Sequence, residues 1–110
     1  MKEDFNGYIA LHKKILDNPV LQDKTDFWIF IHILLKARWQ TKTINEEGFQ
    51  VGKGEFVYVH RTLADELQVH NERLHQALGL FVSEGMIEIF TNGKYKKIWV
   101  KNWDNYQTKK

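Results

Sequence analysis

The apolar residues of this chain change their spacing at Gly85, and this change limits the possible folds more than any other feature of the sequence. Before Gly85 they recur at helical spacing, as at Leu78 and Phe81, whereas after it Ile87 and Ile89 alternate as in a strand. Gly85 can itself adopt the left-handed conformation that ends a helix. The sequence therefore predicts a helix that passes directly into a strand.

A shorter helix is predicted just before this one. Leu63, Ala64 and Leu67 form an apolar stripe one turn long. Val69 is expected to dock the following turn into the core, and the polar pair at residues 70–71 is expected to cap the second helix. Two helices joined by so short a turn are typical of a helix-turn-helix.

A hairpin is predicted after the second helix. The pair Asn92-Gly93 lies between two β-rich runs and is typical of a tight turn, because such a turn needs positive φ at its centre. Residues 55–59 are β-branched and aromatic and are expected to pair with this wing. The predicted fold class is α+β: a winged helix-turn-helix (core at about 61–84, wing at about 86–101) with an N-terminal helical extension and a small antiparallel sheet.

The first part of the chain is predicted to be helical. Residues 8–16 read as an amphipathic helix, which Pro19 ends because the residue before a proline avoids the helical region. The apolar run at residues 27–35 is too broad for a surface helix and predicts a central, mostly buried one, capped by Asp23 or Thr25. The polar, glycine-containing stretch that follows, residues 40–54, is expected to be a loop with one short strand at residues 49–51.

Composition indicates one compact domain, residues 1–110. No stretch of about 18 apolar residues exists, and the amino-terminal MKEDFNGY carries acids where a signal peptide would be basic and then apolar. A soluble protein that is not exported and has no membrane partner is therefore expected. The absence of cysteine excludes disulfides and thiolate metal sites and agrees with a cytoplasmic location.

The charge distribution indicates where a nucleic acid could bind. The net charge is only +2, but residues 94–110 hold six lysines and one acid, whereas residues 63–72 hold three acids and no base. A helix with a polar outer face followed by a lysine-tipped hairpin suits duplex DNA, with the helix in the major groove and the amines against phosphates. The candidate DNA-binding residues are Arg61, Thr62, Asn71, Arg73, His75, Gln76, Lys94, Lys96 and Lys97. Two helices and a hairpin also occur in domains that do not bind DNA, so fold alone does not establish this function.

Several pieces of the sequence in this order resemble the amino-terminal domain of phage replisome organisers and DnaD-type primosome proteins. They are GYIALHKKILDNP, a Phe/Trp-rich helix ending in LLKARW, VGKGEF, TLADELQVHNERLHQALGLFVSEGMIEI, and NW followed by YQ. The resemblance implies a winged-helix domain of a bacterial or phage replication protein that binds origin DNA or self-associates, while a separate carboxy-terminal region contacts the helicase loader. The chain is then either a domain of a longer protein or a small protein that uses the fold for regulation.

One departure from the family leaves alternatives open. Relatives often carry arginine or lysine at the positions of His75 and Gln76, and Glu72 adds a negative charge at the start of this helix. A self-association or protein-interaction module of the replication machinery, or a small transcriptional regulator, therefore remains the alternative to direct DNA binding. A homodimer is predicted as well, because a chain of 110 residues has difficulty burying fifteen aromatic residues completely. Other replication proteins are possible further partners.

The remaining chemistry gives no prediction of catalysis. His70 and His75 are five residues apart, off the spacing that places two metal ligands on one helix face. The sequence lacks a nucleophile-base set and a phosphate-binding glycine loop, so no enzyme, metal or cofactor is expected. Trp28, Trp99 and Trp103 are predicted to lie in the core, because an aromatic side chain buries much apolar area. Trp39 is expected at a subunit interface.

Overall fold

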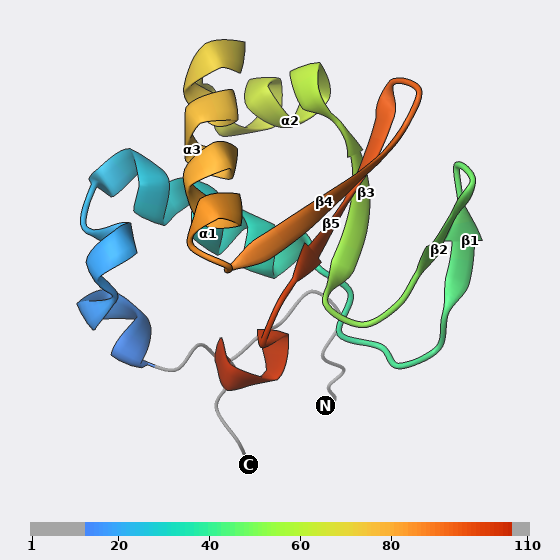
Figure 1. Ribbon diagram of the computed structural model, residues 1–110, viewed down its shortest axis with the longest axis horizontal. Helices are drawn as coiled ribbons and strands as arrows, with labels where there is room; N and C mark the ends of the chain where they lie inside the picture. The colour runs from blue at the N-terminus through green and yellow to red at the C-terminus, as the bar shows by residue number, and fades with distance from the viewer. Residues whose placement is uncertain (1–12, 107–110) are drawn as a thin grey trace, which may run out of the picture.

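The computed structural model describes residues 13–106 (Figure 1). It contains helices and small antiparallel sheets, so the α+β prediction is confirmed. None of the described helices is both long and apolar enough to cross a membrane. In chain order the elements are η1 (Lys13–Asp17), η2 (Pro19–Leu21), α1 (Lys24–Lys36), β1 (Ile44–Glu46), β2 (Phe49–Val51), β3 (Glu55–Val59), α2 (His60–Leu67), α3 (Asn71–Ser83), β4 (Ile87–Asn92), β5 (Tyr95–Val100) and η3 (Trp103–Tyr106).

A three-stranded antiparallel sheet of order β3-β5-β4 forms one layer of the molecule. Strands β4 and β5 make the predicted wing, and β3 pairs with β5 as expected, with Phe56 opposite Ile98. The tight turn predicted at the wing tip is present: Gly93 has positive φ (63°), and Asn92 is the last paired residue of β4. The side chain of Asn92 is therefore available for a contact outside the turn.

Helices α2 and α3 form the helix-turn-helix, with α3 to the left of this sheet and α2 above it in Figure 1, an arrangement compatible with a winged helix. Gln68 takes the left-handed conformation (φ 59°) that ends α2, and Gly85 (φ 74°) allows the chain to leave α3 for β4. The cap predicted at residues 70–71 is wrong in one respect. His70 is the N-cap residue of α3, but its side chain makes no capping hydrogen bond.

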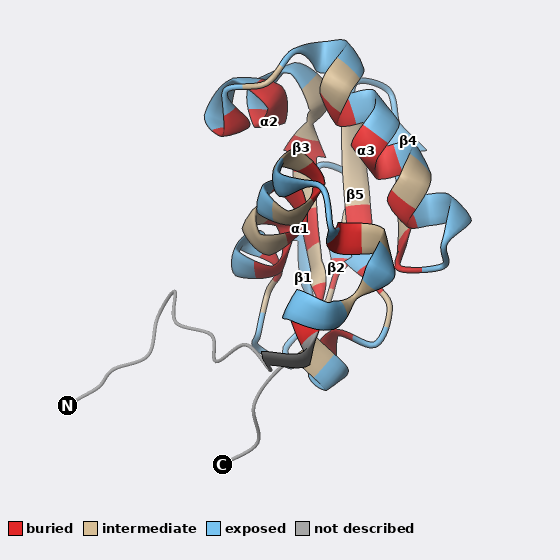
Figure 2. Ribbon diagram, turned by 90° about the vertical axis from the view of Figure 1, so that its left-hand side faces the viewer, coloured by how far each residue is buried: buried red, intermediate tan, exposed pale blue. Residues whose placement is uncertain are grey.

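Helix α1 packs against α3 and supplies much of the core, whose buried residues are red in Figure 2. Asp23 caps it as predicted, since its carboxylate accepts hydrogen bonds from the backbone N–H groups of Thr25 and Asp26. The rings of Phe30 and Phe81 meet edge to face at 5.2 Å between centroids and join α1 to α3. The residues of α1 that are fully enclosed are Ile29, Phe30, Ile33 and Leu34.

Some tryptophans predicted for the core lie at the surface. Trp103 is buried, but Trp28 is 47% exposed and Trp99 is 37% exposed, so the prediction is wrong for these two residues. Trp28 lies on the outer side of α1, and Trp99 alternates with the buried Ile98 and Val100 along β5. The apolar residues of α1 therefore occupy more of the helix surface than the rest of the described chain covers.

One further prediction lies mostly outside the described residues, and another needs correction. The helix expected at residues 8–16 lies mostly outside the described residues, and its described end belongs to the 3-10 helix η1. The stretch at residues 40–54 contains two strands rather than one, because β1 pairs with β2 as a hairpin. This hairpin contacts the wing, since the Asn92 side-chain amide donates a hydrogen bond to the carbonyl of Glu47 (3.0 Å). The tips of the two hairpins lie at the same end of the molecule (Figure 1).

Candidate nucleic-acid interface

The outer face of α3 carries three of the residues predicted to contact DNA. Asn71, His75 and Gln76 are exposed, because the opposite face of the helix is fixed in the core by Leu74 and Leu78. A polar row on the second helix of a helix-turn-helix can reach base edges in a major groove. The geometry of α3 is thus suited to that contact, although Glu72 in its first turn adds a negative charge.

The Arg73 side chain is directed toward the start of α1. Its Nη2 lies 2.9 Å from Asp23 Oδ1 and 2.8 Å from Asp26 Oδ1, so the guanidinium joins the start of α3 to the start of α1. Asp26 is largely buried, with 12% of its side chain exposed. The pKa of Asp23 is lowered, first by the hydrogen bond from the backbone N–H of Asp26 and further by Arg73. Arg73 therefore has a structural contact within the chain, which the sequence did not indicate.

The three wing lysines lie in different surroundings. Lys94 is exposed at the wing tip, with its amine 5.4 Å from the centre of the Tyr95 ring. Lys96 and Lys97 are neighbours on β5 and therefore project to opposite faces of the sheet. Lys97 lies on the face away from α3, where its amine is 3.3 Å from Glu55 Oε2 and donates to the carbonyl of Gln50.

Lys96 projects toward α3 and has no carboxylate partner in the described part of the chain. Its amine is 3.5 Å from the hydroxyl of Thr91. The space beside it is a groove of about 360 Å³ between α3 and the sheet, which we call the wing groove. The described residues that line the wing groove are Tyr58, His60, His75, Leu78, Gly79, Val82, Ser83, Ile89 and Lys96, none of which carries a carboxylate.

His60 connects the two helices at the mouth of the wing groove. Its Nε2 is 2.9 Å from the backbone carbonyl of Asn71, and because a carbonyl can only accept, Nε2 must carry the proton. The rings of His60 and His75 are 6.3 Å apart between centroids. Of the predicted site residues, the structure therefore brings His75 and Lys96 together and places Asn71 next to them.

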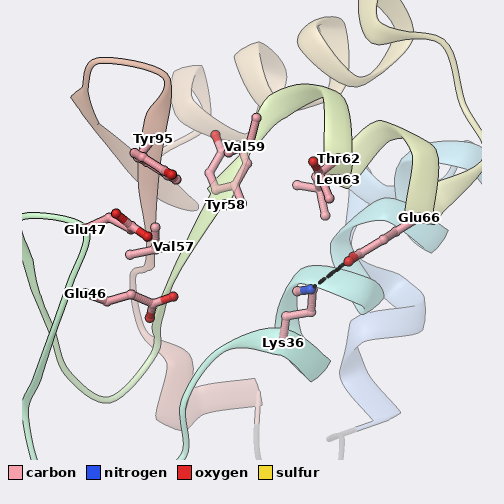
Figure 3. A pocket seen from close by; sticks show the side chains of 10 residues that line it. All are labelled: Lys36, Glu46, Glu47, Val57, Tyr58, Val59, Thr62, Leu63, Glu66 and Tyr95. Atoms are coloured by element: carbon pink, nitrogen blue, oxygen red, sulfur yellow. Dashed lines mark hydrogen bonds and ion pairs between the residues drawn. The ribbon is translucent and has the colours of Figure 1, made fainter.

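The two residues predicted at the start of α2 lie in different surroundings. Arg61 is exposed, whereas Thr62 lines a second hollow of about 240 Å³, which we call the acidic cleft (Figure 3). Glu46 and Glu47 of the β1–β2 hairpin stand on one side of this cleft and Glu66 of α2 on the other. Its described lining residues are Lys36, Glu46, Glu47, Val57, Tyr58, Val59, Thr62, Leu63, Glu66 and Tyr95.

Glu66 is held in place within the acidic cleft. Lys36 Nζ donates to Glu66 Oε1 at 3.0 Å, and His32 Nε2 lies 3.3 Å from the same oxygen. The hydrogen bond from Lys36 is the main cause of a lowered pKa for Glu66. Glu66 therefore remains ionised near neutral pH, with its charge paired to Lys36.

Sequence reasoning did not identify His60, Tyr58 or the Lys36-Glu66 pair. The position of His60 directly before Arg61 was the available signal, since it lies at the start of a helix next to predicted site residues. Tyr58 was assigned only to a strand, and the pair joins residues thirty positions apart, for which the sequence has no local pattern. Within residues 13–106, no group of three or more histidine, aspartate or glutamate side chains is arranged to hold a metal ion.

Comparison with known proteins identifies the family. Residues 6–110 match the sequence profile described as the N-terminal phage replisome organiser. The chain belongs to this family. The resemblance seen in the sequence is thus confirmed, and the replisome organiser domain has a role related to phage DNA replication. Searches of curated proteins and of solved structures give no significant match.

Proposed function

We propose that this replisome organiser domain binds duplex DNA, with α3 in the major groove and the wing tip against the phosphate backbone. The observation that supports this most is the exposed polar row of α3 beside a groove that contains Lys96 and no carboxylate. Binding rather than catalysis would be its contribution to replication. The residues proposed to contact DNA are Arg61, Asn71, His75, Gln76, Lys94 and Lys96.

Three residues that the sequence suggested are not included in this set. Arg73 is paired with Asp23 and Asp26, and Lys97 with Glu55, so using either on DNA would first break an ion pair. Thr62 faces the acidic cleft, where three glutamates would repel phosphate. The cations that remain for phosphates are Arg61, Lys94 and Lys96.

Titration of a labelled duplex at several salt concentrations tests the proposal. Three phosphate contacts predict a slope of about −2 to −3 for log affinity against log salt, at about 0.9 per contact. Replacing Lys94 and Lys96 by alanine should reduce both affinity and slope, while the matched change Lys97→Ala on the opposite sheet face should leave both near wild type. Absence of binding at low salt would reject the proposal.

Base reading by α3 is tested separately. Substituting His75 and Gln76 by alanine should reduce the preference for a specific site more than it reduces general affinity, because a good base contact discriminates by about 1–3 kcal/mol. Unchanged preference would leave a domain that contacts the backbone without reading sequence.

Self-association is a second candidate, and the outer side of α1 favours it. Trp28 is 47% exposed and Leu35, seven residues later on the same side of the helix, is 45% exposed, and Trp39 beyond the helix end is 42% exposed. Exposed apolar residues grouped in this way are typical of an interaction surface. Light scattering at high micromolar concentration should then show a homodimer that Leu35→Glu dissociates, and a monomeric wild type would reject this candidate.

A further inference from the structure

The wing groove has the features of a small-molecule site. Its volume of about 360 Å³ falls in the range of about 300–1,000 Å³ found for ligand pockets. Leu78, Val82 and Ile89 give it apolar walls, and Gly79 leaves one side without a side chain. A Cβ built at Gly79 meets nothing within 4 Å, so the groove stays open over the middle of α3.

Few polar groups face this apolar space, and one of them lacks a partner. Tyr58 is 7% exposed and its hydroxyl has no hydrogen-bond partner among the described residues. Tyr58 lies opposite Lys96 in the sheet, so the two side chains project from the same face, toward α3. Burial raises the pKa of Tyr58. Because its hydroxyl oxygen is itself enclosed, Tyr58 forms part of the groove wall, and the polar end of a ligand would be held by Lys96.

The charged residues around the wing groove indicate which charge a ligand there would carry. The basic side chains Lys36, Lys53, Arg73, Lys97 and Lys101 each form an ion pair with a carboxylate. Lys96, like Arg61 and Lys94, forms no such pair in residues 13–106, and its only polar contact there is the Thr91 hydroxyl. With His60 and His75 in the same lining and no acid among its described residues, an anionic group is favoured at this end of the groove.

We propose that the wing groove binds a small aromatic anion, with its ring between α3 and β4 and its carboxylate or sulfonate at Lys96. The ring replaces water against Leu78, Val82 and Ile89. Because the groove separates the outer face of α3 from the wing, an occupied groove would alter the surface offered to DNA. The proposal rests on the groove itself, so it holds whether or not the domain binds DNA.

Nuclear magnetic resonance with 1-naphthoate as the probe tests this inference. Amide resonances of Gly79, Ile89 and Lys96 should shift and saturate with a dissociation constant of about 1 mM or below, as expected for a ligand of this size. The neutral analogue 1-naphthalenemethanol should bind at least about fivefold more weakly, because it lacks the charge that Lys96 attracts. Shifts confined to Trp28, Trp39 or Trp99 would place the probe on exposed aromatic residues elsewhere and overturn the proposal.

Two variants and two controls make the site assignment specific. Lys96→Gln should weaken naphthoate about tenfold, because it removes the charge at the anionic end of the ligand. Tyr58→Phe removes only an enclosed hydroxyl and should bind about as wild type does. Gly79→Leu should abolish binding by filling the groove, and thermal unfolding verifies that this variant is folded. Lys97→Gln removes a neighbouring charge on the other sheet face and should bind as wild type does. Equal binding by Lys96→Gln and Lys97→Gln, or a folded Gly79→Leu that still binds, would overturn the proposal.

Discussion

Strand β3 lies between two hollows of opposite character. The wing groove on one side contains Lys96, His60 and His75, and none of its described lining residues is acidic. The acidic cleft on the other side contains three glutamates, and its single lysine is already bound to Glu66. A net charge of +2 for the whole chain is therefore an average over two sides that should treat phosphate very differently.

The alternation of side chains along the strands produces this difference. Lys96 and Lys97 are neighbours in sequence, yet one lies opposite Tyr58 and the other opposite Val57, on opposite faces of the sheet. The β1–β2 hairpin then covers part of the second face and brings Glu46 and Glu47 to it. A run of lysines on a strand can thus place only half of its charge on any one binding surface.

The largest expected effect comes from placing a carboxylate in the wing groove. Lys96→Glu should lower the affinity for duplex DNA about tenfold to hundredfold at about 0.1 M salt, because it removes a phosphate contact and adds repulsion. The matched change in the acidic cleft, Glu47→Gln, should leave affinity within about twofold. Fluorescence anisotropy with one duplex measures both. Equal losses for the two variants would mean that the two sides do not differ toward DNA.

The second largest effect is expected on the free energy of unfolding, and it compares two residues on different sides of α3. Arg73→Ala should lower the free energy of unfolding by about 1–3 kcal/mol, because it leaves the largely buried Asp26 carboxylate without its cation. Gln76→Ala, on the exposed side of the same helix, should change stability by no more than about 0.5 kcal/mol. Urea denaturation compares them. A stable Arg73→Ala variant that has lost DNA binding would instead return Arg73 to the DNA face.

The order of the elements could be predicted because local patterns specify them. The period change at Gly85, the apolar stripe of α2 and the β-branched run at residues 55–59 each gave the correct type of element. The β1 strand was missed because none of its three residues is buried, and an exposed strand has no apolar alternation to detect.

The candidate site could be predicted only in part, because contacts between distant residues decide which side chains remain available. Arg73 pairs with Asp23 fifty positions away, and Lys97 bonds Gln50 forty-seven positions away. No local spacing predicts such pairs. His75 and Gln76 were identified correctly as exposed, since a position opposite the apolar stripe of a helix must face outward.

A smaller effect should come from the contact that joins the β1–β2 hairpin to the wing. Gly48 has φ of 84°, and a Cβ there would meet the Asn92 amide that donates to Glu47. Gly93 also has positive φ (63°), but a Cβ there meets nothing within 4 Å. Gly48→Ala should therefore lose about 0.5–1 kcal/mol more than Gly93→Ala, because both strain the backbone and only the first disturbs Asn92. Equal losses in thermal unfolding would show that the hairpin contact adds no stability.

The smallest expected effect is a pH dependence of stability that comes from Glu66 in the acidic cleft. The hydrogen bond from Lys36 lowers the pKa of Glu66 below its usual 4.5, so the ionised carboxylate stabilises the folded state above that pH. This contribution is lost as the pH falls through the lowered pKa. Glu66→Gln should thus be slightly less stable than wild type at pH 7, and the difference should shrink as the pH falls through the lowered pKa.

Partner and salt controls separate this contribution from other charges. Glu66 also faces His32, so its effect should be measured in a double-mutant cycle with Lys36→Gln at each pH. The coupling should be largest near neutral pH, fall on acidification and shrink in high salt, because 40% of the Glu66 side chain is exposed to solvent. A coupling that stays constant from pH 7 to pH 3 would mean that Lys36 and Glu66 stabilise the fold by packing and not by charge.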